Sequence, residues 1–403
     1  EFHGKFRATA RRCTQPDIFC LPVRKYWYGS WHATGGGGAF TLDQLRWYFD
    51  GDPDDGLWFN YVDSICKAIS GLMNKILVII FLLMTPVVSA LEIPGGEYRD
   101  RDDVVAFVKR IAAETSYSEQ ELVDLFAQVN KQSHLFEKLD RPAEKELEWY
   151  QYRRIFIKDK RIDQGVKFWL EHRELLAEVS EKMGVPAEII VAIIGVETVY
   201  GIYKGKDPVF DSLVTLAFDY PRRAPFFKRE LEEFLLLSKE QGFDARALRG
   251  SYAGAMGMPQ FIASSYRNYA IDFDEDGQTN LFDSIPDIAG SVANYFVKHG
   301  WQRDGRVARP LVVSENNTVD RLKPGVKTDY KWAQLQQSGL SSQFDITEET
   351  SVALVKLQQK DRPEYWAGFQ NFYVITRYNH SELYAMAVYQ LAKLISREFK
   401  KLI

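Results

Sequence analysis

The chain has 403 residues, a formal net charge of −4, and a composition that is 46% hydrophobic and 26% charged. This is an ordinary globular composition, sufficient for two or three packed domains, and no basic excess points to a nucleic-acid partner. Aromatic side chains make up 14% of the residues, a proportion that suits a carbohydrate-binding groove and equally a large core.

Residues 73–90 have the parts of a secretory signal peptide. Met73, the first methionine of the chain, is followed by a basic residue and by nine apolar residues at 76–84. Small residues then lie one and three positions before a cleavage site after Ala90. The apolar run is too short to span a membrane readily. The alternative to a signal peptide is a buried core helix. The order of the parts predicts export to a periplasm.

Residues 1–72 precede this signal and show no clear helical or strand period. We interpret them as sequence upstream of the true start, and a genuine extension of unknown role is the alternative. All three cysteines of the chain lie in this segment: Cys13, Cys20 and Cys66. The mature chain, residues 91–403, would therefore lack disulfides, which is compatible with a bacterial periplasm. Because no cysteine follows the signal, we expect no lipid anchor.

Residues 91–165 are predicted to form a helical domain. Apolar side chains recur at helical spacing within 104–111. Ser118 and Glu121 match a capping box, which predicts the start of a second helix. Further helical patterns cover these segments: 144–156, 166–183, 213–218, 226–238 and 381–402. We expect the C-terminal helix, within residues 376–403, to complete the domain.

The most informative segment is 190–201, which places one carboxylate, Glu197, at the end of an otherwise apolar helix. Pro186 suits the first turn of that helix, and Gly201 is expected to stop it. No side chain within 189–196 is charged, so the helix must be largely buried. Burial makes a carboxylate costly to ionise and should raise its pKa. Glu197 is therefore a candidate proton donor, with a surface Glu in the last helical turn as the alternative.

Two further segments carry candidate ligand-binding groups. Residues 250–261 contain glycines and small side chains, which allow a ligand to approach the backbone closely. Within them Gln260 offers both a donor and an acceptor to a sugar, and a tight structural turn is the alternative. Residues 373–381 place polar groups before the last helix, where Asn379 or Ser381 could instead serve only as a cap.

Residues 272–283 match a calcium-binding loop of the EF-hand type. Oxygen donors fall at positions 1, 3, 5, 9 and 12, glycine stands at position 6, and position 7 would offer its backbone carbonyl. The predicted ligands are Asp272, Asp274, Asp276, Gln278, Asn280 and Asp283. Position 12 is Asp rather than Glu, and the shorter side chain is less suited to bidentate binding. One loop without a partner loop predicts a structural Ca²⁺ site, with an acidic solvated turn as the alternative.

The character of the sequence changes after Gly300. Short β-branched runs at 307–313 and 351–357 are separated by polar, turn-rich segments. They predict a small β subdomain, residues 301–375, inserted in a helical protein. The predicted fold class is therefore mainly α, of the α+β type.

Several of these segments together resemble the B-type lytic murein transglycosylases. Five motifs agree with that family in order and spacing: 193–198, 220–223, 253–260, 290–296 and 372–379. The resemblance runs from about residue 93 to the C-terminus. It implies a lysozyme-like core at residues 166–300 that carries the EF-hand loop. It also implies cleavage of the β-1,4 bond between N-acetylmuramic acid and N-acetylglucosamine in peptidoglycan, leaving a 1,6-anhydromuramoyl end.

The resemblance also implies roles for individual side chains. Glu197 would be the catalytic acid and base, and no second carboxylate occurs in a comparable motif. The side chains that would line the sugar subsites are Gln260, Tyr295, Tyr378, Asn379, Tyr152, Arg222, Arg223 and Ser251. The implied partner is the glycan strand of peptidoglycan, bound by a monomer, with other cell-wall enzymes as further partners.

A single carboxylate predicts a substrate-assisted mechanism, because ordinary glycosidases use two. Glu197 would protonate the leaving oxygen, the substrate's N-acetyl group would stabilise the cation at C1, and Glu197 would then accept the proton of the C6 hydroxyl. Two other interpretations stay open. One is a lysozyme-type hydrolase on the same scaffold, and the other is a non-catalytic, calcium-stabilised protein that binds peptidoglycan.

Overall fold

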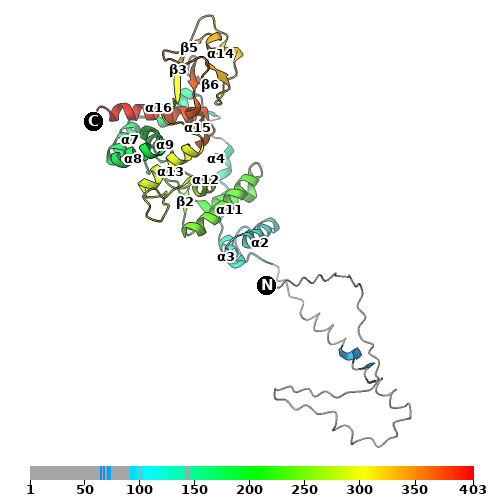
Figure 1. Cartoon of the computed structure of the whole chain (residues 1–403). Helices are drawn as coiled ribbons and strands as arrows, with labels where there is room; N and C mark the ends of the chain where they lie inside the picture. Colours follow the sequence, from blue (N-terminus) through cyan, green and yellow to red (C-terminus); the bar gives the residue numbers. More distant parts are fainter. Residues whose placement is uncertain (1–63, 66, 69, 74–90, 100, 141–145) are drawn as a thin grey trace, which may run out of the picture. The chain divides into compact units, whose positions relative to one another are not determined.

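A computed structural model describes residues 64, 65, 67, 68, 70–73, 91–99, 101–140 and 146–403. The chain divides into two units, residues 1–88 and 89–403, and the second is described below (Figure 1). Apart from Met73, the predicted signal peptide lies outside the described residues, as do most residues of the predicted upstream segment. Within the described part of the chain, every helix is too short or too polar to span a lipid bilayer.

The second unit begins with the helices α2 (Asp102–Glu114), α3 (Glu119–Phe126) and α4 (Leu135–Asp140). The predicted capping box is present: the backbone N–H of Ser118 donates to Glu121 Oε2 at 2.8 Å, and that of Glu121 donates to Ser118 Oγ at 3.2 Å. Asp219 ties this region to the rest of the unit by accepting hydrogen bonds from Tyr98 Oη and Arg101 Nη1, each at 2.8 Å.

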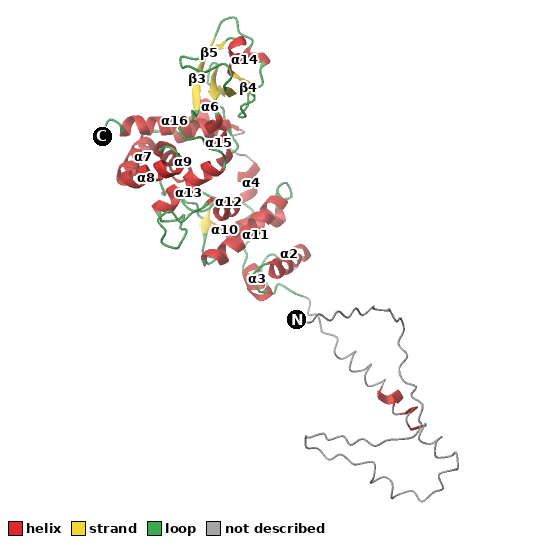
Figure 2. Ribbon diagram, viewed as in Figure 1, coloured by secondary structure: helices red, strands yellow, loops and turns green. Residues whose placement is uncertain are grey.

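The helical patterns further along the chain form a bundle (Figure 2). Its helices are α6 (Trp149–Phe156), α7 (Asp159–Glu171), α8 (Arg173–Met183), α9 (Ala187–Thr198), α10 (Val209–Asp219), α11 (Ala224–Gln241), α12 (Ala263–Tyr269), α13 (Ile285–Lys298), α15 (Gln370–Tyr378) and α16 (Glu382–Phe399). The pattern at 166–183 is split between two helices, because the chain leaves helical geometry at His172 (φ −119°, ψ 28°).

Helix α9 is the centre of the bundle and packs against α7, α8, α13 and α16. Every residue within it is buried except Glu188 and Glu197, one near each end. The uncharged run within 189–196 is therefore enclosed on all sides, as its composition predicted, and the burial of these apolar side chains is what holds the helix in place. The two-residue strands β1 (Asp207–Pro208) and β2 (Arg249–Gly250) pair near this bundle.

The β subdomain, whose strands are yellow in Figure 2, forms one antiparallel sheet. The strand order is β4-β6-β7-β3-β5. Its strands are β3 (Ala308–Val313), β4 (Tyr330–Lys331), β5 (Leu340–Ser341), β6 (Ser351–Gln358) and β7 (Pro363–Gly368). It also contains the 3₁₀ turn η2 (Val319–Arg321) and α14 (Trp332–Gln337), which place Val319 and Trp332 in a hydrophobic cluster of its own. The predicted fold class, mainly helical with a small β subdomain, is confirmed.

Candidate active site

A cavity of about 910 Å³ is the candidate active site. Its lining comes from five segments that are far apart in the sequence: Leu139, Glu197, 220–223, 251–262 and 378–382. The lining includes most of the predicted site residues, namely Glu197, Gln260, Tyr378, Asn379, Arg222, Arg223 and Ser251. Folding therefore brings the motifs of the sequence analysis together around one hollow of sugar-binding size.

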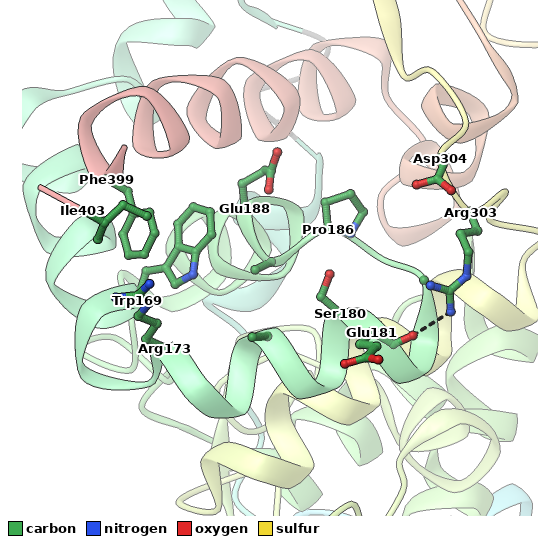
Figure 3. A pocket seen from close by; sticks show the side chains of 13 residues that line it. Trp169, Arg173, Ser180, Glu181, Pro186, Glu188, Arg303, Asp304, Phe399 and Ile403 are labelled. Atoms are coloured by element: carbon green, nitrogen blue, oxygen red, sulfur yellow. Dashed lines mark hydrogen bonds between the residues drawn. The ribbon is translucent and has the colours of Figure 1, made fainter. Parts of the chain in front are cut away.

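A second cavity, of about 510 Å³, lies at the other end of α9 (Figure 3). Its wall includes Glu188 near the start of α9, and Trp169, whose ring stacks on that of Phe399 with centroids 4.1 Å apart. The residues that line it include none of the predicted site residues. The two glutamates of α9 thus face different cavities, and only Glu197 lies among the sequence motifs.

The backbone after Glu197 reverses sharply. Gly201 was expected to stop α9, but the helix already ends at Thr198, because Val199 and Tyr200 adopt left-handed conformations at φ 52° and 60°. Such conformations are unfavourable for a β-branched residue and persist only where the surroundings enforce them. Thr198 supplies part of that enforcement, since its Oγ1 donates to the Met258 carbonyl at 2.9 Å and accepts the N–H of Gly201 at 3.0 Å.

One partner of Glu197 comes from the last helix. Tyr384 Oη donates a hydrogen bond to Glu197 Oε1 at 2.5 Å, across 187 positions of sequence. Tyr384 is buried, and burial together with the charge of Glu197 raises the pKa of its phenol well above the usual value. The phenol therefore keeps its proton at physiological pH, and it holds one oxygen of the half-buried carboxylate in a fixed position.

Gln260 is also held tightly. Its backbone adopts a left-handed conformation at φ 52°, and its side-chain nitrogen donates to the carbonyls of Gly257 at 2.8 Å and Lys204 at 3.1 Å. The amide hydrogens are thus directed at the protein, so the group that Gln260 offers to the cavity is its carbonyl oxygen. A ligand would meet a hydrogen-bond acceptor here, rather than the donor and acceptor expected from the sequence.

Three predicted tyrosines occupy different positions. The Tyr378 side chain lines the cavity, while its hydroxyl donates to the Pro259 carbonyl at 2.6 Å. Tyr295 is buried behind it, with ring centroids 4.8 Å apart, and its hydroxyl donates to the Arg377 carbonyl at 2.6 Å. Tyr152 is 1% exposed and lies on α6, near enough to Tyr384 to contribute to the raised pKa of that phenol. Neither Tyr295 nor Tyr152 is among the residues that line the cavity.

The remaining predicted groove residues lie in the turns around the cavity. Ser251 Oγ accepts the backbone N–H of Ala255 at 3.0 Å, which orders the turn between them. Arg223 places its guanidinium 4.3 Å from the centre of the Phe226 ring. Arg222 and Asn379 line the cavity from two different turns. The cavity lining therefore includes cationic, amide and hydroxyl groups besides Glu197, and this lining suits a polar, carboxylate-bearing sugar.

The acidic loop at 272–283 brings three of its predicted ligands together. Carboxylate oxygens of Asp272, Asp274 and Asp276 all lie within 4.8 Å of one another. Asp272 also orders the loop by accepting the N–H of Gly277 at 2.8 Å, and Gly277 has a φ of 90° that favours glycine. Desolvation and the neighbouring carboxylates, Asp287 foremost, raise the pKa of Asp274, which is itself exposed. All the donors are oxygens, so the group fits a hard cation such as Ca²⁺.

The other end of the loop differs from the expected EF-hand arrangement. Asn280 Oδ1 accepts the N–H groups of Phe282 and Asp283, at 2.9 and 3.1 Å. The carboxylate of Asp283 is exposed and accepts a hydrogen bond from Lys204 Nζ at 3.0 Å, so the structure does not bring it into the group of three. A further carboxylate beside the loop belongs to Asp287 on α13, which is 1% exposed and accepts the N–H groups of Phe273 and Asn280.

Sequence reasoning missed three acidic or phenolic groups at these sites. Tyr384 lies in the first turn of α16, where Ser381 caps the helix by accepting the Tyr384 N–H at 3.3 Å. The cap is a weak sequence signal for its position, but nothing in the sequence links Tyr384 to Glu197. Glu382 lines the cavity as a second carboxylate, in a motif unlike that of Glu197. Asp287 lies outside the twelve-residue pattern and joins the acidic loop only because α13 folds back on it.

Comparison with known proteins identifies the fold and its family. The family model described as "Transglycosylase SLT domain" matches residues 99–393. The chain is 39% identical over 311 residues to membrane-bound lytic murein transglycosylase B of Escherichia coli K12, covering 75% of this chain and 85% of the relative.

Solved structures agree with this match. The soluble lytic transglycosylase SltB1 of Pseudomonas aeruginosa is 44% identical with a TM-score of 0.70, and the match covers 73% of this chain and 99% of that one. The Escherichia coli lytic transglycosylase Slt35 in complex with calcium is 39% identical with a TM-score of 0.71, covering 76% and 96%. The chain therefore belongs to the SLT family of lytic murein transglycosylases, enzymes that act on peptidoglycan.

Proposed function

We propose that this enzyme cleaves the β-1,4 bond between N-acetylmuramic acid and N-acetylglucosamine and leaves a 1,6-anhydromuramoyl end, with Glu197 as its only acid and base. The observation that carries the proposal is the position of Glu197, at the end of a buried helix, in the wall of the 910 Å³ cavity and in contact with Tyr384. A Pseudomonas aeruginosa relative, SltB3, is 26% identical and has been solved in complex with NAG-anhNAM-pentapeptide.

In the first step protonated Glu197 gives its proton to the glycosidic oxygen, which leaves as the C4 hydroxyl of N-acetylglucosamine. The carbonyl oxygen of the muramoyl N-acetyl group bonds to C1 and carries the positive charge. In the second step ionised Glu197 takes the proton of the C6 hydroxyl while that oxygen bonds to C1 and displaces the acetamide oxygen. Glu197 ends protonated, as it began, and no water is consumed.

Tyr384 and Gln260 support these steps without exchanging protons. The Tyr384 phenol donates to Glu197 Oε1, which stabilises the ionised carboxylate between the two proton transfers. Gln260 presents its carbonyl oxygen to the cavity and suits the N–H of an acetamide group. The cationic side chains of Arg222 and Arg223 suit the carboxylates of the lactyl and peptide substituents.

A lysozyme-type hydrolase is the second candidate, because Glu382 is another carboxylate in the wall of the same cavity. Two carboxylates are what ordinary glycosidases use. Mass spectrometry of the muropeptides released from purified peptidoglycan separates the two functions. We expect products that are one water lighter than the hydrolytic ones, and products with reducing muramoyl ends would instead establish the hydrolase. The absence of any release would favour a protein that only binds peptidoglycan.

We further propose a structural Ca²⁺ site at the acidic loop. Asp272, Asp274 and Asp276 would supply carboxylate oxygens, Gln278 its backbone carbonyl, and Asp287 a fourth carboxylate in place of Asp283. Binding of Ca²⁺ neutralises the mutual repulsion of these carboxylates and fixes the loop. The loop contacts the turn that carries Gln260, because the N–H of Met258 donates to the Leu281 carbonyl at 2.8 Å. The Escherichia coli relative solved with calcium supports this proposal.

Calcium is therefore expected to raise the melting temperature. With Ca²⁺ at about one hundred times its dissociation constant, we expect a rise of about 5 °C relative to the chelated protein. Calorimetric unfolding measures the difference, and the double variant Asp272→Asn/Asp276→Asn should show none. Equal melting temperatures for the unmodified chain with calcium and with a chelator would rule out the site.

The proposed place of action is the periplasm, reached through the predicted signal at residues 73–90. This location is supported by the substrate class of the family, which is peptidoglycan, a component of the cell wall. The proposed glycan-binding form is a monomer.

A further inference from the structure

Lys204 connects the acidic loop to the glycan-binding cavity. Its ammonium donates to the Phe282 carbonyl at 2.8 Å and to Asp283 Oδ1 at 3.0 Å. Its own backbone carbonyl accepts the hydrogen bond from Gln260 Nε2 at 3.1 Å. Lys204 therefore holds the C-terminal end of the acidic loop with its side chain. It holds the Gln260 side chain with its backbone carbonyl.

The two residues before Lys204 are largely exposed. Ile202 and Tyr203 are 56% and 70% exposed, although the Tyr203 N–H donates to the Thr198 carbonyl at 2.9 Å. Gly205 lies so close to Gly250 that a Cβ added to it would be 2.1 Å from the Gly250 carbonyl carbon. The segment therefore packs directly against the backbone next to Ser251.

The side chain of Gln260 bonds to one acceptor that lies outside its own turn. Its left-handed backbone conformation, at φ 52°, is unfavourable for a residue with a side chain and needs external restraint. One of its two side-chain acceptors, the Gly257 carbonyl, belongs to the same turn, and the other is Lys204. The Lys204 carbonyl is thus the contact that orients Gln260 from outside the turn.

We propose that Lys204 is a positioning residue for glycan binding: its charge-assisted bonds to Phe282 and Asp283 fix the carbonyl that orients Gln260. The inference rests on the proposed function, because it assumes that the cavity holds a glycan strand. It also assigns Asp283 to this link instead of to the cation. A partly exposed ion pair contributes little to global stability, so the effect of Lys204 should be on binding and not on folding.

The test compares Lys204→Met with the unmodified full-length chain, using a soluble peptidoglycan fragment as substrate. We expect KM to rise about fivefold, with kcat changed by less than about twofold and the melting temperature by less than about 2 °C. Lys204→Arg should restore KM because it keeps the charge. Lys206→Met is the matched control, since Lys206 is an exposed neighbour, and it should leave KM unchanged.

A double-variant cycle separates positioning from a merely structural role. If Lys204 acts through Gln260, Lys204→Met should raise KM no further in a Gln260→Ala background. An unchanged KM in Lys204→Met, or effects of the two substitutions that multiply, would overturn the proposal.

A binding measurement distinguishes failure of this proposal from failure of the proposed function. Calorimetric titration of the same fragment is performed in a Glu197→Gln background, where no turnover is required. We expect the dissociation constant to rise about fivefold on adding Lys204→Met, and an equal constant would overturn the positioning role. Absence of turnover by the unmodified chain would contradict the lytic function alone.

Discussion

Replacing Glu197 with Gln is expected to lower the turnover of peptidoglycan by about 10³-fold, because a glutamine amide can neither give nor take the proton in either step. The amide has nearly the shape of the carboxylate and can accept the hydrogen bond from Tyr384. The fold and the affinity for glycan fragments should therefore be retained. Release of muropeptides, followed by mass spectrometry, measures turnover, and calorimetric titration measures binding.

Glu188→Gln is the matched control for this variant. Glu188 belongs to the same helix but lies at its other end, in the wall of the second cavity. The control should release muropeptides at the rate of the unmodified chain. Wild-type turnover in Glu197→Gln would remove Glu197 from the mechanism and would direct attention to Glu382.

Replacing Tyr384 with Phe is expected to lower kcat by roughly tenfold to a hundredfold. The change removes one hydrogen bond to a charged group, which is worth about 1.5–3 kcal/mol. Without that donor the ionised carboxylate is less stable, so Glu197 stays protonated to a higher pH. The pH above which kcat/KM falls should therefore move upward. The phenol of Tyr384 does not itself set this limit, because its pKa lies well above the usual value.

Tyr389→Phe is the control for Tyr384→Phe, since it makes the same chemical change on the same helix. The hydroxyl of Tyr389 donates to the Ala308 carbonyl at 3.0 Å, away from Glu197. Both variants lose a buried hydrogen bond, so their melting temperatures should fall by similar amounts. If both variants also had the same kcat and the same pH profile, Tyr384 would have only a structural role.

The helical and sheet content of this protein was accessible from local pattern. The burial of α9 could be predicted from its uncharged run of residues, and the start of α3 from the capping box at Ser118. In both cases the signal comes from residues that are close in sequence and that interact through their own backbone. The end of α9 was less accessible, because the left-handed Val199 follows Thr198, whose hydroxyl bonds to the carbonyl of Met258, 60 positions further along the chain.

The acidic loop shows the limit of a linear motif. Its spacing identified three carboxylates that do converge, Asp272, Asp274 and Asp276. The same spacing predicts a ligand at position 12, Asp283, whose carboxylate bonds to Lys204, while the carboxylate of Asp287 on α13 bonds to the loop from outside the pattern. A twelve-residue pattern contains no information on which neighbouring helix will pack against the loop.

The sequence by itself determined the family, the mainly helical fold with its small β subdomain, and the isolation of Glu197 in an apolar helix, because each depends on composition and on order along the chain. Only the tertiary structure decided which groups meet that carboxylate. Tyr384 is 187 positions away in sequence, and Tyr295 lies behind the cavity wall instead of in it. These outcomes depend on how separate helices pack, and packing is set by the shapes of all the buried side chains together.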